Sequence, residues 1–387
     1  MRLEALSAGV LAIYMAAFLM YDTVLVGWLV SGLFYPFYLA FVMVPVALLV
    51  TTGVRLQVVP LALFLVFVAV VAGGVVRAQH PPNFDVVQQL VVVLLGPLAL
   101  IQIQDRGGLR AVRAALTLSA VPLVAWTLQA AWQQGFTGRA AVASDPNVAA
   151  FYLVLTLPAV ASWGHDQAVS RDRGRRLKVA LAVLLIVAVV YAVVLQASRG
   201  LLLAAAVTLA AMGVLLLVRY RRPPAALWWV SLPAVALPWL PGVNVLAERF
   251  TTERVASGGL RTLIWEATLA AHTQGGFWDA FIGRGMLESR AMVAGAFATL
   301  TSTHNAFLHV LVEYGFVGVV VMTALLLLPL SRAGRLPTGD ALLAVGLVAA
   351  LAAAAMTLNT SETFLFWVAL GVANAAVWLH ASDGMRS

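Results

Sequence analysis

Long apolar stretches separated by short polar segments recur along the whole chain. An α-helix needs about 20 mostly apolar residues to cross the roughly 30 Å of hydrocarbon in a bilayer, and about twelve stretches approach that length. We therefore predict membrane-spanning helices over residues 3–21, 30–51, 56–76, 86–103, 112–132, 147–163, 179–197, 200–218, 225–242, 305–330, 340–357 and 362–380. Only Ser198 and Arg199 separate the seventh and eighth spans, so a tight turn is expected there.

The composition indicates that these helices lie in lipid. Apolar residues make up 62% of the 387 positions and charged residues only 10%, whereas roughly 25% of a typical soluble domain is charged. The chain is expected to be an all-α, polytopic integral membrane protein with about 12 transmembrane helices. Cysteine is absent, which excludes disulfides, thiolate catalysis and cysteine-ligated metal. The first apolar stretch lacks a small-residue cleavage site, so no cleavable signal peptide is expected.

The basic residues predict the orientation. The net charge is +8, but the 24 Lys and Arg are scattered over short loops, so a nucleic-acid partner is not expected. Alternate loops carry them very unequally, and the richer set contains Arg2, Arg55, Arg106, Arg110, Arg113, Arg171, Arg173, Arg175, Arg176, Lys178, Arg219, Arg221, Arg222, Arg332, Arg335 and Arg386. The positive-inside rule makes that set cytoplasmic, together with both termini.

The predicted spans and loops divide the chain into three parts. Residues 1–242 are predicted to hold the first nine spans, and residues 305–387 the last three. Residues 243–304 between them are predicted to form one sizeable external, periplasmic loop.

Arg199 is the first candidate functional residue. It lies in a predicted external hairpin between two very apolar helices, where the positive-inside bias disfavours arginine. One interpretation is a turn residue whose guanidinium reaches the membrane interface. The other is recognition of phosphate, which suits the planar fork of arginine better than lysine. Arg139, on an earlier external loop, is a further candidate for such a site.

Arg261 opens a predicted amphipathic helix over residues 260–272, directly after two glycines. A helix lying on the membrane surface explains the pattern. An anion site is the alternative, because free backbone N–H groups at a helix start bind anions. Arg254 and Arg249, earlier in the loop, are further candidates. The apolar side of the helix is predicted to contain Leu260, Ile264, Ala267 and Leu269.

His304 lies where the external loop meets the predicted 305–330 helix. Ser302 or Thr303 is expected to cap that helix, which would place His304 in its first turn. There the positive end of the helix dipole favours the neutral imidazole, which can accept a proton as a general base. A capping or interfacial histidine is the alternative.

Metal ligands are not expected to gather in this region. His309 lies about 140° round the helix from His304, so the two do not form a natural ligand pair. Glu313 is predicted to lie on yet another face. Because no His, Asp or Glu grouping has zinc spacing, no catalytic metal is predicted.

Taken in order, these residues resemble the O-antigen ligase and polymerase superfamily of bacterial polysaccharide export. The order of the motifs on one predicted side of the membrane is specific, although each motif is short. The late external loop is similar too, but it is short for a protein that embraces a lipid A core, which leaves the acceptor open. The resemblance is carried by Ser144-Asp145-Pro146-Asn147 before Leu157-Pro158, Ser198-Arg199-Gly200, Arg261, Thr303-His304-Asn305-Ala306-Phe307-Leu308 and Glu313-Tyr314-Gly315.

The resemblance implies a metal-independent, inverting glycosyl transfer on the outer face of the inner membrane, with no cofactor. The donor would be a glycan on undecaprenyl pyrophosphate. The acceptor would be another lipid-linked glycan for a polymerase, lipid A core for a ligase, or a protein, as in some relatives. Polymerase is slightly favoured. Arg199 and Arg261 would hold the pyrophosphate, and His304 would accept or position the acceptor proton. Further substrate contacts would be Arg139, Arg254 and Asn305.

Two other classes of protein present similar residues. A lipid-linked-glycan flippase or secondary transporter would be expected to carry charged or broken helices near the bilayer midplane. A structural partner in a cell-envelope assembly would tolerate replacement of Arg199, Arg261 and His304. The polar residues gather at the predicted outer mouth of the protein, which favours an enzyme acting at the interface.

Overall fold

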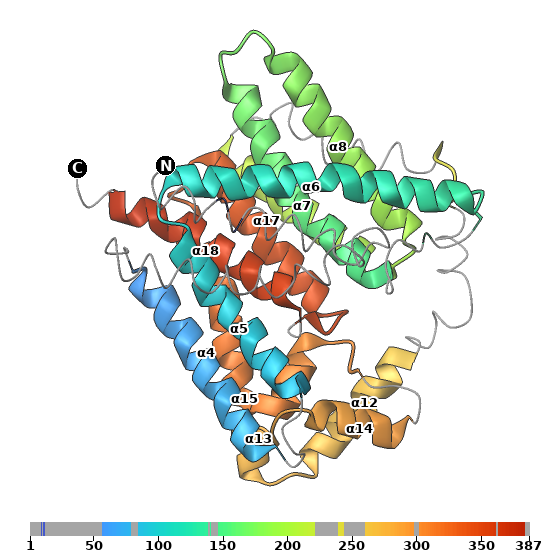
Figure 1. Ribbon diagram of the computed structural model, residues 1–387, viewed down its shortest axis with the longest axis vertical. Helices are drawn as coiled ribbons and strands as arrows, with labels where there is room; N and C mark the ends of the chain where they lie inside the picture. Colours follow the sequence, from blue (N-terminus) through green and yellow to red (C-terminus); the bar gives the residue numbers. More distant parts are fainter. Residues whose placement is uncertain are drawn as a thin grey trace.

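The fold is known from a computed structural model that describes residues 9, 11, 56–78, 84–137, 140, 146–220, 239–243, 260–297, 302–360 and 363–383. These residues form helices joined by turns (Figure 1), with no strand among them. The helices are α4 (Val58–Arg77), α5 (Phe84–Gln102), α6 (Arg106–Gln133), α7 (Pro146–Val169), α8 (Arg175–Leu195), α9 (Arg199–Arg219), α12 (Leu260–Thr273), α13 (Phe277–Ile282), α14 (Glu288–Ala296), α15 (Ala306–Leu327), α16 (Leu330–Ala333), α17 (Thr338–Ala355) and α18 (Phe364–Asp383).

Several of these helices can cross a membrane, as predicted. Seven in the described part of the chain are long and apolar enough, and α5 and α18 contain shorter apolar segments, Leu90–Gln102 and Leu365–Leu379. The expected total of about 12 stays a prediction, because the spans at 3–21, 30–51 and 225–242 lie outside the described residues apart from a few positions. The seven are Val58–Arg77, Arg106–Gln133, Asn147–Val169, Arg175–Leu195, Arg199–Arg219, Ala306–Ala333 and Thr338–Ala355.

The helices extend beyond their predicted apolar stretches. Helix α6 begins at Arg106 rather than residue 112, because the Asp105 carboxylate accepts a hydrogen bond from the Gly108 N–H (2.6 Å) and caps the helix there. Helix α7 continues to Val169 rather than 163. Hydropathy measures the buried length of a span, whereas capping residues outside the hydrocarbon decide where the helix ends.

Helix α17 lies at the centre of the bundle and packs against α7, α9 and α18. Helix α18 packs in turn against α5, and α15 packs against α4. A Cβ at Gly371 of α18 would lie 2.6 Å from the carbonyl oxygen of Gly96 in α5, so these two backbones touch. Close contact at small residues is the usual way for helices to associate in lipid, where apolar burial alone gives no preference.

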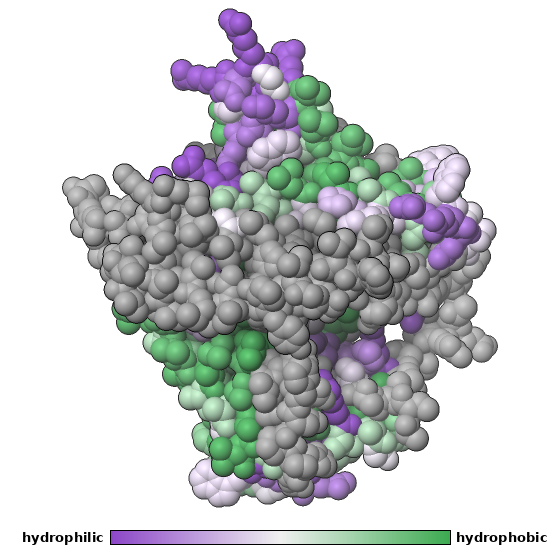
Figure 2. Space-filling model, in the orientation of Figure 1, coloured by the Kyte–Doolittle hydropathy of each residue, from purple (hydrophilic) through white to green (hydrophobic). Residues whose placement is uncertain are grey.

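Two ends of the molecule are distinct (Figure 1). The α7–α8 turn projects at the top of the view, and α12, α13 and α14 lie together at the bottom. Hydrophilic side chains gather around the projecting turn in Figure 2, while apolar side chains cover the left flank below it. Arg113 ties α6 to α7 near the turn by pairing with Asp166 and donating to the Ser162 hydroxyl (2.9 Å).

The predicted amphipathic helix is present as α12, with a partly different buried side. Ile264 is 1% exposed as expected, but Leu269 is 43% exposed. Thr268 and His272 are buried instead, each one turn after the previous buried residue. Two further short helices, α13 and α14, follow α12 before α15 and were not predicted.

Candidate active site

Arg199 is the first residue of α9, and its side chain is exposed. The turn before it contains Ala197 with a positive φ of 49°. Ser198 occupies the cap position in extended conformation, but its side chain makes no capping hydrogen bond. The first N–H groups of a helix have no partner within the helix and favour anions. The start of α9 therefore combines an arginine with a positive helix end.

The start of α9 packs closely against the residues that follow α17. A Cβ at Gly200 would lie 2.6 Å from the Thr357 Cβ, so only glycine fits there without a shift. Glycine at this position lets the two backbones approach closely. The Arg199 turn is thus fixed relative to the residues that connect α17 to α18.

Two segments that were predicted to be external are held at the same turn. The N–H of Ala140 donates to the carbonyl of Leu195 at the end of α8 (3.0 Å), and the Tyr191 hydroxyl donates to the carbonyl of Pro241 (2.7 Å). The predicted candidate Arg139 precedes Ala140 and lies outside the described residues, as do Arg249, Arg254, Ser144 and Asp145. The segment leading into residues 243–304 therefore begins beside the Arg199 turn.

Helix α12 carries Arg261, which is half-buried. Trp265, one turn later, donates its indole N–H to the carbonyl of Thr303 (2.9 Å). Residues four apart lie on the same face of a helix. The structure therefore places Trp265, on the α12 face that also carries Arg261, against the residue that precedes His304.

His304 lies just before α15 and not in its first turn, so that prediction is wrong. The cap is Asn305, whose side-chain oxygen accepts a hydrogen bond from the N–H of Leu308 (3.0 Å). Ser302 instead accepts from the N–H of His304 (3.2 Å) and shapes the turn. His304 is half-buried and has a positive φ of 49°, a conformation that costs free energy for a non-glycine residue.

A buried polar cluster lies one turn inside α15, and sequence reasoning missed it. Glu313 and His309 are 0% and 2% exposed, with the carboxylate 3.4 Å from the imidazole Nε2. The prediction that Glu313 faces elsewhere is wrong, because positions four apart share a helix face. The Ser289 hydroxyl of α14 lies 2.7 Å from both the His309 Nδ1 and the Glu313 carboxylate. The i, i+4 spacing was the available signal, whereas Ser289 is distant in sequence.

Gly315 kinks α15 next to this cluster. Its φ of 67° is non-helical, which frees two carbonyls of the preceding turn. The Val312 carbonyl accepts from the N–H of Arg284 (2.9 Å), and the Glu313 carbonyl from the N–H of Gly285 (3.1 Å). The segment between α13 and α14 thus satisfies the backbone groups that the kink exposes.

The same segment is also held by α4. The N–H of Met286 donates to the carbonyl of Gly74 (3.0 Å). Gly283, with φ 80°, lies so close to the Glu313 carbonyl that a Cβ would overlap it. Residues 283–286 are therefore fixed between two spanning helices, and they carry α14 with them.

Charged groups at the outer edge of this region are engaged in structural contacts. Arg77 pairs with Asp279 (3.0 Å), and the Arg284 guanidinium approaches the same carboxylate (3.7 Å) while donating to the Ala271 carbonyl (2.8 Å). Burial lowers the pKa of His272, the nearby Arg284 lowers it further, and Asp279 opposes them. His272 is thus kept neutral.

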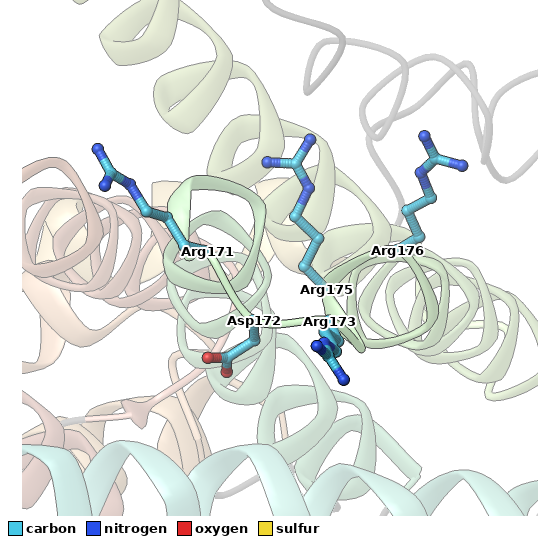
Figure 3. A pocket seen from close by; sticks show the side chains of 5 residues that line it. All are labelled: Arg171, Asp172, Arg173, Arg175 and Arg176. Carbon is cyan, nitrogen blue, oxygen red and sulfur yellow. The ribbon is translucent and has the colours of Figure 1, made fainter.

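The opposite end of the molecule has a hollow with a different character. It is lined by Arg171, Asp172, Arg173, Arg175 and Arg176, and every one of these residues is exposed. Figure 3 shows Arg171, Arg175 and Arg176 pointing to one side, with Asp172 and Arg173 directed to the other. These residues belong to the predicted cytoplasmic set, and the positive-inside rule explains them.

A comparison with known proteins bears on this geometry. Residues 181–323 match the sequence model of the family described as O-antigen ligase, a segment that contains Arg199, Arg261, His304 and Asn305 but not Arg139. No curated protein matches the chain. The match confirms the resemblance predicted from the motifs: this chain is similar to the O-antigen ligase and polymerase superfamily.

Proposed function

We propose that this protein is a membrane glycosyltransferase that moves a glycan from undecaprenyl pyrophosphate to an acceptor hydroxyl at the outer face of the inner membrane. The observation that carries the proposal is the bond from Trp265 to Thr303, which joins the arginine-bearing helix to the His304 turn. Both elements lie within the segment that matches the O-antigen ligase family. A cation for the leaving group and a base for the acceptor are what such a transfer requires.

The leaving group is the pyrophosphate, and Arg199 and Arg261 are proposed to bind it. An arginine fork can contact two phosphate oxygens at once. Arg199 is also the first residue of α9, and the positive end of a helix dipole favours an anion there. As the sugar departs, negative charge grows on the bridging oxygen, and these groups stabilise it more than they stabilise the ground state.

The acceptor side is proposed to depend on His304. The acceptor oxygen attacks the anomeric carbon while the bond from that carbon to the pyrophosphate oxygen breaks, which inverts the configuration. The acceptor proton passes to the His304 imidazole, and undecaprenyl pyrophosphate leaves. Asn305 caps α15, and its role is to hold the His304 turn in place. Arg139 and Arg254 remain proposed substrate contacts.

We favour polymerase slightly over ligase, because the predicted external loop, residues 243–304, is short for a protein that must embrace lipid A core. The proposal needs no metal, so EDTA is expected to leave the rate unchanged.

The test uses purified full-length protein, an undecaprenyl-pyrophosphate-linked oligosaccharide, and lipid A core added or withheld. Ladders of longer lipid-linked glycan without core would identify a polymerase, and product only with core would identify a ligase. No transfer by a well-folded sample supplied with its native glycan would contradict the proposal and favour a transporter. Strong inhibition by EDTA would contradict the metal-independent mechanism.

A further inference from the structure

Helix α13 leaves most of its apolar surface uncovered, and the proposed transfer makes no use of that surface. None of the six residues of this helix is buried. The exposed fractions of its large apolar side chains are 71% for Phe277, 63% for Trp278, 41% for Phe281 and 39% for Ile282. A gathering of exposed apolar side chains marks a contact surface for a protein, a ligand or a membrane.

The four apolar side chains share one face of α13. At roughly 100° per residue their positions cover an arc of about 140° around the helix. Within this face the rings of Phe277 and Phe281, one turn apart, stack with 5.8 Å between their centroids and 9° between their planes. Asp279 lies on the other side, where its carboxylate pairs with Arg77 (3.0 Å) and approaches Arg284 (3.7 Å). The protein therefore holds α13 by its polar side and leaves the aromatic face open.

The contacts of Arg77 place α13 level with the end of a spanning helix. Arg77 is the last residue of α4. Besides pairing with Asp279, its guanidinium donates to the carbonyl of Trp278 (3.4 Å), and Figure 1 shows α13 beside this end of α4. A spanning helix ends where hydrocarbon gives way to the headgroups, and tryptophan is enriched in that layer. The aromatic face of α13 is thus at the depth of the membrane interface.

The surface of α4 has the character of a lipid-facing surface. Only 28% of its most apolar stretch is buried within the protein, the smallest share among the seven candidate spans in the described part of the chain. Val66 and Val76 are 47% and 87% exposed. In a bilayer, lipid covers such side chains, and α13 is bonded to the last residue of the same helix. A lipid surface therefore accounts for the aromatic face of α13 without a partner chain.

We propose that α13 is an interfacial anchor, which inserts its aromatic face into the phospholipid leaflet at this end of α4. Amphipathic helices bind membranes by burying their apolar face about 5–10 Å into the boundary between headgroups and acyl chains. Residues 283–286 follow α13 directly and are bonded to α4 and α15. The anchor therefore ties the segment from α12 to α14, which was predicted to be wholly external, to the surface of the bilayer. Its existence is independent of the glycosyl transfer.

The test measures how deeply α13 lies, and the absence of cysteine from the chain allows a single label at each chosen position. Phe281→Cys and Ile282→Cys each receive a nitroxide spin label in full-length protein in phospholipid nanodiscs. The accessibility of each label to oxygen, which concentrates in lipid, is divided by its accessibility to a water-soluble nickel chelate. Val66→Cys on α4 is the lipid reference, and Arg173→Cys on the hydrophilic α7–α8 turn is the water reference, both at exposed positions.

Both α13 labels are expected to give ratios between the two references, at a depth of about 5–10 Å. Ratios equal to that of Arg173→Cys would show that α13 lies in water and would overturn the anchor. Labels that neither reagent reaches would show that protein, such as a second copy of this chain, covers the face, which would also overturn it. Each of these results stands whether or not the protein transfers glycan.

A second comparison tests the two stacked rings. Combining Phe277→Ser and Phe281→Ser is expected to shift the label at Ile282→Cys toward the water reference, because the buried apolar area is lost. Phe277→Tyr with Phe281→Tyr is expected to keep the label in place, since tyrosine suits the interface. The ratio at Val66→Cys in the serine background verifies that the protein is still inserted. An Ile282→Cys ratio that is the same in the serine and tyrosine variants would contradict the role of the rings.

Discussion

The two ends of the molecule differ in the exposure of their charged and polar side chains. At the α7–α8 turn, four arginines within six residues are exposed, and Figure 3 shows three of them pointing to one side and Arg173 to the other. The ion pair between Lys178 and Asp172 is exposed too, with 42% and 63% of the two side chains accessible. Exposed pairs of this kind add little stability.

The end formed by α12–α15 has fewer basic residues and far more bonding between polar groups. Thr303, Asn305, His309 and Glu313 are all less than 10% exposed and hydrogen-bonded across elements or along the α15 entrance. We interpret the exposed arginines as a signal of membrane topology, and the buried polar contacts as the surroundings of the proposed site. The predictions below test that distinction, beginning with the largest effect.

Arg199→Ala and Arg261→Ala are each expected to lower the transfer rate by about 100-fold or more, because each removes a charged donor to the leaving group. Arg199→Lys should recover only a small part, since lysine offers a point charge in place of a fork. The measurement is kcat/KM with equal amounts of membrane-inserted protein. Arg173→Ala, at the other end, is the matched control, and a comparable loss in that variant would remove the distinction.

Gly283→Ala tests how firmly the segment of residues 283–286 is fixed. The residue needs φ 80°, and a Cβ would overlap the Glu313 carbonyl. A loss of at least about 2 kcal/mol of stability is expected from the combined strain and overlap. Gly295→Ala in α14 is the control, because a Cβ there meets no atom within 4 Å. Equal unfolding temperatures for the two variants would show that the segment is not fixed as described.

Trp265→Phe isolates the bond between α12 and the His304 turn. The ring is kept, but the hydrogen bond to the Thr303 carbonyl is lost, which is worth about 1 kcal/mol and corresponds to roughly a fivefold lower rate. Trp278→Phe is the control, because Trp278 is 63% exposed. A rate for Trp265→Phe equal to that of the control would mean that this bond does not position Arg261.

His272 gives the smallest effect, a dependence of stability on pH. Burial and Arg284 lower its pKa in the folded protein, so the unfolded chain binds a proton more readily as pH falls below about 6.5. Stability should therefore decrease as pH falls from that value toward the folded pKa. His272→Gln is expected to flatten this part of the unfolding curve, and an unchanged acid slope would contradict the assignment.

The sequence predicted the spanning helices well because a span must be apolar along its length. It also predicted α12, where two glycines precede an amphipathic pattern. It did not predict the cap of α15, because Ser302, Thr303 and Asn305 are all capable caps. In the structure Asn305 is the cap. Trp265 donates to the Thr303 carbonyl and Ser302 accepts from the N–H of His304. These contacts depend on the tertiary fold.

The buried residues His309 and Glu313 show a second limit of prediction from sequence. His309 and Glu313 are four residues apart, so their contact could have been predicted from helical geometry alone. Their partners could not, because Ser289 is 20 residues and Asn359 is 50 residues from His309. Likewise, Gly315 lies in the Glu313-Tyr314-Gly315 motif, but the kink at Gly315 depends on the backbone of residues 283–285, which packs against it.

The most direct measurement compares transfer rates of wild type, Arg199→Ala and a fourfold variant in which Arg171, Arg173, Arg175 and Arg176 become glutamine. All three are assayed side by side with an undecaprenyl-pyrophosphate-linked oligosaccharide. The account predicts a loss of about 100-fold for Arg199→Ala and less than about threefold for the fourfold variant, despite its much larger change in charge. A full rate in Arg199→Ala, or a collapse in the fourfold variant with normal insertion, would contradict it.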